Sequence, residues 1–545
     1  MVKYILILFF ILNTKTIFSQ VISTNEIQLM DTLRVQELIN KSTNSNISYL
    51  LRSTKLYYNN IDINTSKNFR ILNTFFKYDN QNNSFLPISF NDGNFFPARG
   101  WQERYSVGLN IKFGIFDINY QPEKIIVENK PQEFFAGDVG NYWARYYQLV
   151  RNNIDDFRSV GFGNKIDTTT FGQSYIGLNF GKISLGATNQ NLWWGPGIRN
   201  SLIFTNSAAG FQHLYLSSTK PIETPFGNLE FNGIIGRLEP TRFEDPDDPF
   251  MRTMWEGGIA QKKLNTRTIK AFTLNLQPNF FKNFYIGYAF SRQLYQNDKN
   301  IFDIKYSFFS KDQPKMDLGV LMFRVMLPKN HAEFYGELGQ PEKAPWPWKF
   351  FGDSVRTGFV IGLRKFVPLK NKNFIFEFST EFVQLSLMNP RLIFNADPRA
   401  DGPQFNSWYT SPIIRQGYSN DGQLLGSNIG PGSNSQFLSI AFRYKKNRIG
   451  FNFEKITYNY DFYYFNYLSD FIGKGWFDRM WIDLNRSIDL QLSLNKNLFL
   501  IANFMVTDAW NYRWYRRDDF QYYLRSSPDD KYNTRINFSI KYNLK

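Results

Sequence analysis

Residues 105–113, YSVGLNIKF, alternate between large apolar side chains and small or polar ones. Successive side chains of a β-strand point to opposite faces, so this alternation predicts a strand with one apolar face. The apolar face would carry Tyr105, Val107, Leu109, Ile111 and Phe113. A strand of this kind suits a sheet that separates two different environments.

The same alternation returns along the rest of the chain. Clear examples are SYIGLNFG, FYIGYAFS, RTGFVIGLRKF, FIFEFSTEFVQL, SQFLSIAFRY and the C-terminal TRINFSIKYNLK. Some runs are joined by short Asn, Lys or Gly turns, and others by long loops rich in Pro, Gly and Asp. Short turns at one rim and long loops at the other are typical of an outer-membrane barrel. The runs amount to about 18 strands.

The composition points to the same class of protein. Aromatic residues make up 18% of the 545 residues, yet the mean hydropathy of -0.39 is that of a polar chain. A membrane β-barrel combines these properties, because lipid-facing side chains alternate with polar lumen-facing ones and aromatic rings gather at both interfaces.

The N-terminus reads as a secretory signal peptide over residues 1–19. Lys3 gives a positive start, residues 4–12 are apolar, and Ser19 is a small residue before the expected cleavage site. The apolar run is far shorter than the roughly 20 residues of a spanning helix, and no later run is long enough. The chain has no cysteine, which excludes lipoprotein attachment and disulfides. An exported membrane protein without spanning helices must cross as closed strands.

Two segments do not alternate. Residues 131–163 contain Tyr142, Trp143, Tyr146, Tyr147 and Val150 at helical spacing. We expect a helical insert there, at about 138–152, as a plug or periplasmic cap. Residues 21–64 are polar and weakly periodic, which leaves a helical piece and a flexible lead-in as open alternatives.

These observations predict an all-β fold, a transmembrane antiparallel β-barrel of about 18 strands with a small helical plug element. Residues 20–104 would hold the N-terminal lead-in, the first strands or a periplasmic segment. Residues 105–545 would form the barrel with its insert. The protein would be integral to the outer membrane after signal-peptide cleavage.

No catalytic constellation stands out. The two histidines, His213 and His331, lie far apart and without metal-ligand spacing. The pairs Glu333 with Glu337 and Glu377 with Glu381 share strand faces, as acidic ladders in a polar lumen do. We therefore predict a protein that is not an enzyme, with no cofactor and no metal site.

The formal net charge of +16 bears on the partners. For an exported chain it favours lipid phosphates or acidic polysaccharides over nucleic acid as the counter-charge, although a general basic bias of the proteome explains it as well. The expected partners are an acidic or neutral surface polysaccharide, outer-membrane lipid or lipopolysaccharide, and other outer-membrane proteins. Nucleic acid is not expected.

Aromatic residues on loops rich in Pro, Gly and Asn are the candidates for carbohydrate contact, because sugar rings stack on them while amides and guanidinium groups bind the hydroxyls. The candidates are Trp193, Trp194, Arg199, Trp346, Trp348, Trp408, Tyr409, Arg415 and Tyr418. For most individual tryptophans, the interfacial girdle is the favoured explanation. For Trp193 and Trp194, packing against the barrel wall is the favoured alternative.

Several motifs together resemble the Wzi capsule assembly family in its Bacteroidetes-type form. They are NDGNFFPARGWQERYSVGLNIKFGIFDINYQPE, NYWARYYQLVRNNIDDFRSVGFG, NLWWGPGIRNSLIFTNSAAG, AEFYGELGQ and RQGYSNDGQLLGSNIGPGSNSQ, in this order along the chain. The resemblance covers the chain from about Asn91 onward. It implies a barrel whose periplasmic side is occluded by a small helical element, and a lectin-like role in attaching capsular or exopolysaccharide. One departure is NSAA at 206–209, where the family usually has SNNA.

Three functions remain open at this level. The first is a non-enzymatic surface lectin for polysaccharide attachment or assembly. The second is a structural barrel partner of an outer-membrane secretion or adhesion complex. The third is a porin-like channel.

Overall fold

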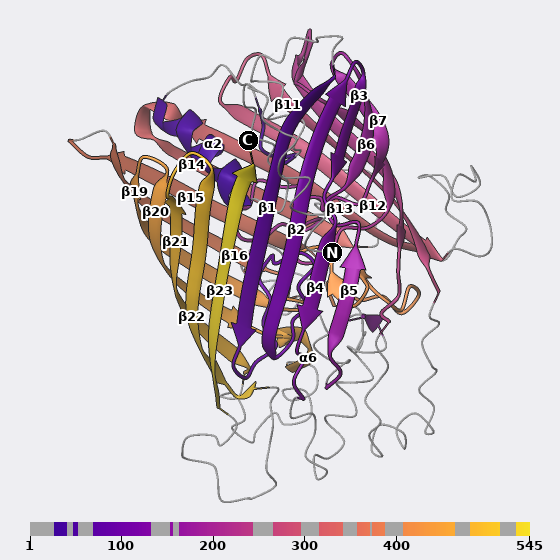
Figure 1. Ribbon diagram of the computed structural model, residues 1–545, viewed down its shortest axis with the longest axis vertical. Helices are drawn as coiled ribbons and strands as arrows, with labels where there is room; N and C mark the ends of the chain where they lie inside the picture. The colour runs from indigo at the N-terminus through magenta and orange to yellow at the C-terminus, as the bar shows by residue number, and fades with distance from the viewer. Residues whose placement is uncertain are drawn as a thin grey trace, which may run out of the picture.

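The computed structural model describes residues 27–40, 47–52, 69–131, 153–155, 163–242, 265–295, 315–341, 357–370, 373–386, 407–463, 480–512 and 530–544. Its main feature is a single antiparallel sheet that closes into a ring (Figure 1). The ring closes where β1 (Arg70–Asn83) pairs with both β2 (Gly100–Phe113) and β23 (Lys531–Leu544).

Three positions of the ring are each shared by two consecutive short strands. These are β3 (Phe116–Tyr120) with β4 (Glu123–Val127), β5 (Ile166–Thr170) with β6 (Tyr175–Phe180), and β8 (His213–Ser218) with β9 (Ile222–Thr224). The remaining strands are β7 (Ile183–Thr188), β10 (Gly227–Leu238), β11 (Arg267–Pro278), β12 (Phe284–Tyr295), β13 (Lys315–Leu327), β14 (Ala332–Pro341), β15 (Gly358–Pro368), β16 (Phe374–Gln384), β19 (Asn434–Tyr444), β20 (Asn447–Thr457), β21 (Ile482–Ser493) and β22 (Leu498–Trp510). The barrel therefore has 18 strand positions, as the sequence predicts.

Alternation along the strands sets the two faces of the barrel wall. On β2, Val107 and Phe113 are more than half exposed on the outside, whereas Gln102 and Ser106 are buried in the lumen. The last strand repeats the pattern, with Ile536, Ile540 and Tyr542 on the outer face and Arg535, Ser539 and Lys541 inward. An apolar outer face and a polar inner face are what lipid on one side and a polar lumen on the other require.

The two rims differ in the length of their connections. One rim carries tight turns, such as those between β2 and β3, β6 and β7, β19 and β20, and β21 and β22, together with the 3-10 turn η4 (Pro328–Asn330) between β13 and β14. At the other rim, β4, β10, β12, β14, β16, β20 and β22 are followed by long connections in the sequence. The tight-turn rim is the periplasmic one in barrels of this class.

The lumen is filled from both ends. Near the tight-turn rim lies helix α2 (Ile27–Asn40), in indigo at the upper left of Figure 1, and α6 (Tyr460–Tyr463) lies at the opposite end. From the long-connection rim, residues 84–99, 189–212 and 407–433 fold inward, and the last of these includes the small hairpin of β17 (Ser419–Asn420) and β18 (Gln423–Leu424). These inserts and the inner wall share one apolar cluster.

One helix described inside the barrel comes from a segment whose structure the sequence leaves open. The expected insert at 138–152 lies outside the described residues. The helix inside the barrel is α2, which comes from the 21–64 segment whose structure the sequence left open. Among the described helices, none is long and apolar enough to cross a bilayer.

Candidate ligand-binding chamber

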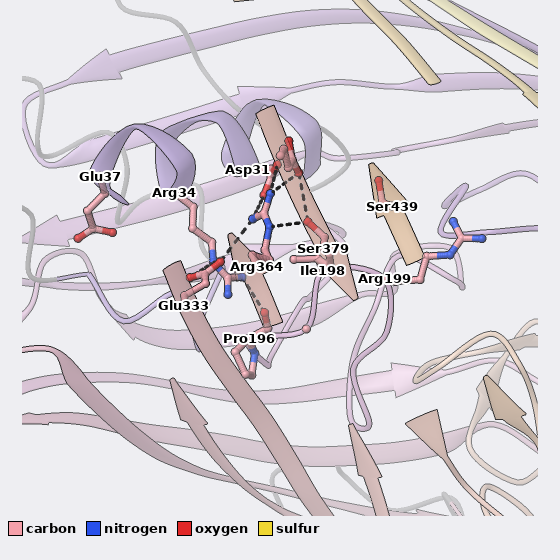
Figure 2. Close-up of polar contacts among 12 residues, drawn as sticks. Asp31, Arg34, Glu37, Pro196, Ile198, Arg199, Glu333, Arg364, Ser379 and Ser439 are labelled. Carbon is pink, nitrogen blue, oxygen red and sulfur yellow. Dashed lines mark hydrogen bonds and ion pairs between the residues drawn. The ribbon is translucent and has the colours of Figure 1, made fainter. Parts of the chain in front are cut away.

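Helix α2 is attached to the inner wall by buried ion pairs. Arg34 Nε donates to the Glu333 carboxylate at 3.0 Å, and Arg324 Nε on β13 donates to the same carboxylate at 2.8 Å. Arg34 also donates to the backbone carbonyl of Pro196 at 2.6 Å, which links the helix to the inward loop (Figure 2). A charge-assisted network of this kind fixes one orientation of the helix.

A second set of ion pairs surrounds Asp31 at the start of the helix. Arg364 Nη1 lies 2.6 Å and Arg443 Nη2 3.0 Å from the Asp31 carboxylate. Both arginines also contact Glu377, at 3.0 and 2.6 Å. Burial raises the pKa of Asp31, but the positive charges of Arg364 and Arg443 outweigh it, so the pKa lies below its ordinary value.

The loop containing Trp193 and Trp194 is folded into the lumen, with both indole rings almost completely buried. The Arg52 guanidinium lies over the Trp193 ring at 4.5 Å, and Trp194 packs edge-on against Phe204 at 4.9 Å between ring centroids. Gly195 has φ +144°, and a Cβ there would lie 2.1 Å from a Glu337 carboxylate oxygen. Only glycine fits this turn.

Two lumen-facing carboxylates hold the same loop through its backbone. Glu381 accepts hydrogen bonds from the N–H groups of Ile198, Arg199 and Asn200, at 2.7, 3.2 and 2.7 Å. Glu337 accepts from the Leu202 N–H at 2.7 Å. All four members of the predicted acidic ladders face the lumen and are buried, and there they bind the plug helix or the inward loop.

The candidate residues of the 407–433 segment also lie in the packed interior. Trp408 occupies a slot made by the facing glycines Gly339 and Gly358, where a Cβ would come within 2.7 and 2.6 Å of the indole. Tyr409 and Tyr418 stack at 5.7 Å, and the Tyr409 hydroxyl donates to the Leu202 carbonyl at 2.9 Å. A glycan cannot reach these rings in this arrangement.

The structure thus separates the predicted site residues into three groups. Trp193, Trp194, Trp408, Tyr409 and Tyr418 are buried packing residues. Arg415 is partly exposed and donates its backbone N–H to the Tyr295 hydroxyl at 3.0 Å, and Trp346 and Trp348 lie outside the described residues. Among the candidates that the structure describes, Arg199 is the one in the lining of the cavity described next.

That cavity, which we call the luminal chamber, lies between α2, the inward loops and the wall formed by β15, β16, β19 to β23, β1 and β2. Its volume is about 290 Å³. The Arg199 guanidinium lies 4.3 Å from the Phe90 ring centroid and 5.3 Å from that of Phe437, and pairs with Glu454 at 2.6 Å. Phe90 also lies 5.8 Å from the Arg535 guanidinium.

Cationic side chains outnumber anionic ones in the chamber lining. The cations are Arg52, Lys77, Arg104, Arg199, Arg364, Arg443, Arg448 and Arg535. The anions are Asp31, Asp79, Asp92, Glu377 and Asp489. Amide and hydroxyl groups complete the lining, among them Asn452, Gln491, Asn503, Asn537 and Ser439. Guanidinium groups bind carboxylates in two-pronged fashion, and amides both donate to and accept from sugar hydroxyls.

Most chamber residues are absent from the sequence-based candidates. Arg535 and Arg448 alternate with apolar residues in their strands, so their inward orientation was available from the period-two pattern. Phe90 and Asp92 lie in a loop, and nothing in the local pattern shows that this loop folds into the lumen. Most of the described aromatic residues on Pro- and Gly-rich loops, which the sequence suggests as carbohydrate contacts, are packing residues instead.

Comparison with known proteins places this fold in a family. The family model described as capsule assembly protein Wzi matches residues 133–466. No curated protein matches the chain. Among solved structures, the fold is similar to that of the Escherichia coli outer-membrane protein Wzi, described as involved in group 1 capsule assembly and as a carbohydrate-binding β-barrel. The identity is 12%, the TM-score is 0.53, and the match covers 86% of this chain and 83% of that one.

Less similar barrels include Acinetobacter baumannii OccAB2, with 11% identity, a TM-score of 0.40 and coverage of 87% and 98%. Pseudomonas aeruginosa OccK5 has 11% identity, a TM-score of 0.39 and coverage of 87% and 99%. The family match extends over more than half of the residues, and the 18-position barrel agrees with it. This chain belongs to the capsule assembly protein Wzi family and is an outer-membrane β-barrel.

Proposed function

We propose that this protein is a non-enzymatic carbohydrate-binding barrel that helps to attach or assemble capsular polysaccharide or exopolysaccharide at the cell surface. The observation that carries the proposal is a Wzi-family barrel whose lumen is occupied by α2 and the inward loops and holds a cavity lined by arginines and amides. These side chains supply the hydrogen-bonding groups that carbohydrate recognition uses.

The filled lumen argues against a diffusion porin. Helix α2 and the inward loops share one packed apolar cluster with the wall, and Arg34 ties the helix to both the wall and the loop. A porin needs a continuous aqueous path. We expect little conductance in planar bilayers, and a large, steady current would favour the channel function instead.

The test compares a deletion strain with a strain complemented by the wild-type chain. We expect deletion to move polysaccharide from the cell-bound fraction to the medium, measured as uronic acid or total hexose in each fraction. Complementation with Glu223→Ala is the matched control, because the Glu223 side chain is 85% exposed. Unchanged retention in the deletion strain would contradict the proposal.

A structural role in an outer-membrane complex predicts a different result. In that case a protein partner would co-purify in fixed stoichiometry from native membranes in mild detergent. Analysis of the same preparation for carbohydrate separates the two functions, because a carbohydrate-binding barrel retains glycan whether or not a protein accompanies it.

A further inference from the structure

Within the part of the chain that the structure describes, the luminal chamber opens toward the tight-turn rim. Along β22, the inward residues Met505, Thr507 and Ala509 are buried near the long-connection rim. Nearer the tight-turn rim, the inward residues Ile501 and Asn503 on the same strand are partly exposed. On β22, the exposed fraction of the inward side chains therefore increases toward the tight turns.

Neighbouring strands show the same gradient. On β21 the Asp483 residue is 2% exposed, whereas the Asp489 side chain, nearer the tight turns, is 32% exposed. On β20, Ile456 is fully buried, whereas the Arg448 side chain is 16% exposed. The inward loops close the chamber toward the long-connection rim, and its opening lies along the tight-turn half of β20 to β22.

The opening faces the periplasm, because tight turns mark the periplasmic rim of outer-membrane barrels. Helix α2 lies near the same rim, and its Asp31 is itself part of the chamber lining. A ligand in the chamber would therefore lie beside the helix and enter from the inner side of the membrane.

The lining indicates an anionic ligand. Three arginines, Arg364, Arg443 and Arg448, converge on the single carboxylate of Glu377 at 3.0, 2.6 and 3.3 Å. Arg448 is the most exposed of the three. Arg448 has two carboxylate partners, Glu377 at 3.3 Å and the partly exposed Asp489 at 3.8 Å, and it shares Glu377 with two other arginines. An additional carboxylate at the opening would meet this arginine at a smaller desolvation cost than in the fully buried network.

The remaining groups and the volume fit a sugar. In the same lining, Asn452, Asn503 and Asn537 are partly exposed amides, and Gln491 pairs with Arg448 across β20 and β21. About 290 Å³ is close to the lower end, roughly 300 Å³, of pockets that hold small molecules, which suits one or two monosaccharide units.

We propose that the luminal chamber is a periplasm-facing binding site for a carboxylate-bearing sugar, with Arg448 as the carboxylate ligand and the surrounding amides as hydroxyl ligands. This proposal rests on the proposed carbohydrate-binding function and adds the class of sugar and the side of the membrane. Two sources supply such sugars on that side, a uronate-containing polysaccharide and cell-wall glycan whose muramic acid carboxylate is free of its stem peptide.

Binding is tested with the full chain in detergent by titration calorimetry. The probes are a glucuronate-containing disaccharide, its carboxyl-reduced form, and a muramic-acid-containing disaccharide. We expect at least one acidic probe to bind about tenfold or more tightly than the reduced form, with weaker binding at high salt. Tighter binding of the first acidic probe identifies polysaccharide as the source, and tighter binding of the second identifies cell wall.

Two variants locate the site. Gln491→Glu adds a negative charge at a partly exposed position and should weaken binding of the acidic probe at least tenfold. Arg448→Gln should do the same, because Glu377 keeps Arg364 and Arg443 as partners and the fold is retained. The matched control is Arg242→Gln at the other rim, whose side chain is 47% exposed. Heat-modifiable mobility in gels verifies that each variant is folded.

The side of the membrane is tested by cysteine labelling, which the absence of native cysteine makes specific. Gln491→Cys should react with a polyethylene glycol maleimide only after the outer membrane is permeabilised, whereas Arg242→Cys should react in intact cells. Labelling of Gln491→Cys in intact cells would overturn the periplasmic orientation.

The remaining outcomes separate this proposal from the general function. Equal binding of the acidic and reduced probes, or acidic binding that neither chamber variant weakens, overturns the chamber site. Polysaccharide retention by the complemented strain would then still support the proposed function. Absence of binding by every probe, together with unchanged retention after deletion, overturns both.

Discussion

Helix α2 and the loop of residues 189–212 both occupy the lumen, but different forces hold them. The helix is attached mainly through charged side chains, with Arg34 bound to Glu333 and Asp31 bound to Arg364 and Arg443. The loop is held by its own backbone N–H groups, which donate to Glu381 and Glu337, and by the buried rings of Trp193 and Trp194. Two inserts in one lumen therefore have different sensitivities to salt and pH.

This difference suggests that the loop is part of the barrel fold, whereas the helix is a separately attached element. Backbone donors in a buried loop have no alternative partner once the carboxylate is removed, so their loss costs the desolvation energy of each group. Buried ion pairs contribute less net stability, because each charge also loses its hydration on burial. The following experiments test this contrast, from the largest expected effect to the smallest.

Glu381→Ala should be the most damaging change. It removes the acceptor of three backbone N–H groups and of the Tyr335 hydroxyl, which donates at 3.0 Å. We expect a loss of unfolding free energy on the order of 3 kcal/mol or more, measured by urea unfolding in detergent or liposomes. Glu223→Ala, at an exposed position, is the control. Equal stability of the two variants would contradict the role of the loop.

The double variant Asp31→Asn and Arg34→Met should release α2 and leave the barrel intact. Both ion-pair sets lose their helix partner, while Glu333 retains Arg324 at 2.8 Å. Amide hydrogen exchange over residues 27–40 should become about ten- to a hundredfold faster, whereas exchange in β1 and β23 should not change. If the barrel strands lost protection together with the helix, the helix would not be a separate element.

Acid should weaken the attachment of α2 through Asp31. Burial raises the pKa of this carboxyl, but Arg364 and Arg443 lower it more, so the pKa in the attached state lies below the ordinary value. The contribution is fully present above that ordinary value and is lost as pH falls through the attached-state pKa. Exchange over residues 27–40 should not change between pH 8 and 5 beyond its intrinsic pH dependence. It should accelerate below about pH 4, and Asp31→Asn should remove this transition.

Ser201→Ala should have the smallest effect. The Ser201 hydroxyl donates to the Trp194 carbonyl and lies 3.1 Å from the Glu337 carboxylate, whose bond from the Leu202 N–H remains in the variant. We expect a loss of about 1 kcal/mol in the unfolding free energy and no change in hydrogen exchange of α2. A change in helix exchange would show that loop and helix are coupled.

The wall of the barrel could be predicted because its signal is local. The outer residues of β2 and β23 alternate with inner ones over the whole strand, and lipid selects apolar side chains at every second position. The residues that fill the lumen show no comparable local pattern in the sequence. An inward polar residue such as Glu333 has the same local pattern whether it meets water or the guanidinium of Arg34, which lies 299 residues away in the chain.

The position of α2 and the lining of the chamber could not be predicted from the sequence, for related reasons. The buried face of α2 carries Arg34 and Glu37, so the usual rule of an apolar buried stripe does not identify it. Trp193 and Trp408 lie on loops rich in Gly, Pro or Ser, and the sequence cannot distinguish a ring presented to solvent from one packed in a lumen. Arg199 was found because it is adjacent to the Trp-Trp motif.

The pairing of β1 with β23 has a consequence for biogenesis. Thr74 pairs with Leu544, so the seam joins residues that lie 470 positions apart in the chain. The ring cannot seal until the final strand arrives, and such long-range pairing is slow. Helix α2 precedes all the described strands in the chain and lies inside the ring, so it has to be in place when the seam forms. A defect in β23 would therefore leave the helix outside its enclosure, even though no residue of the helix had changed.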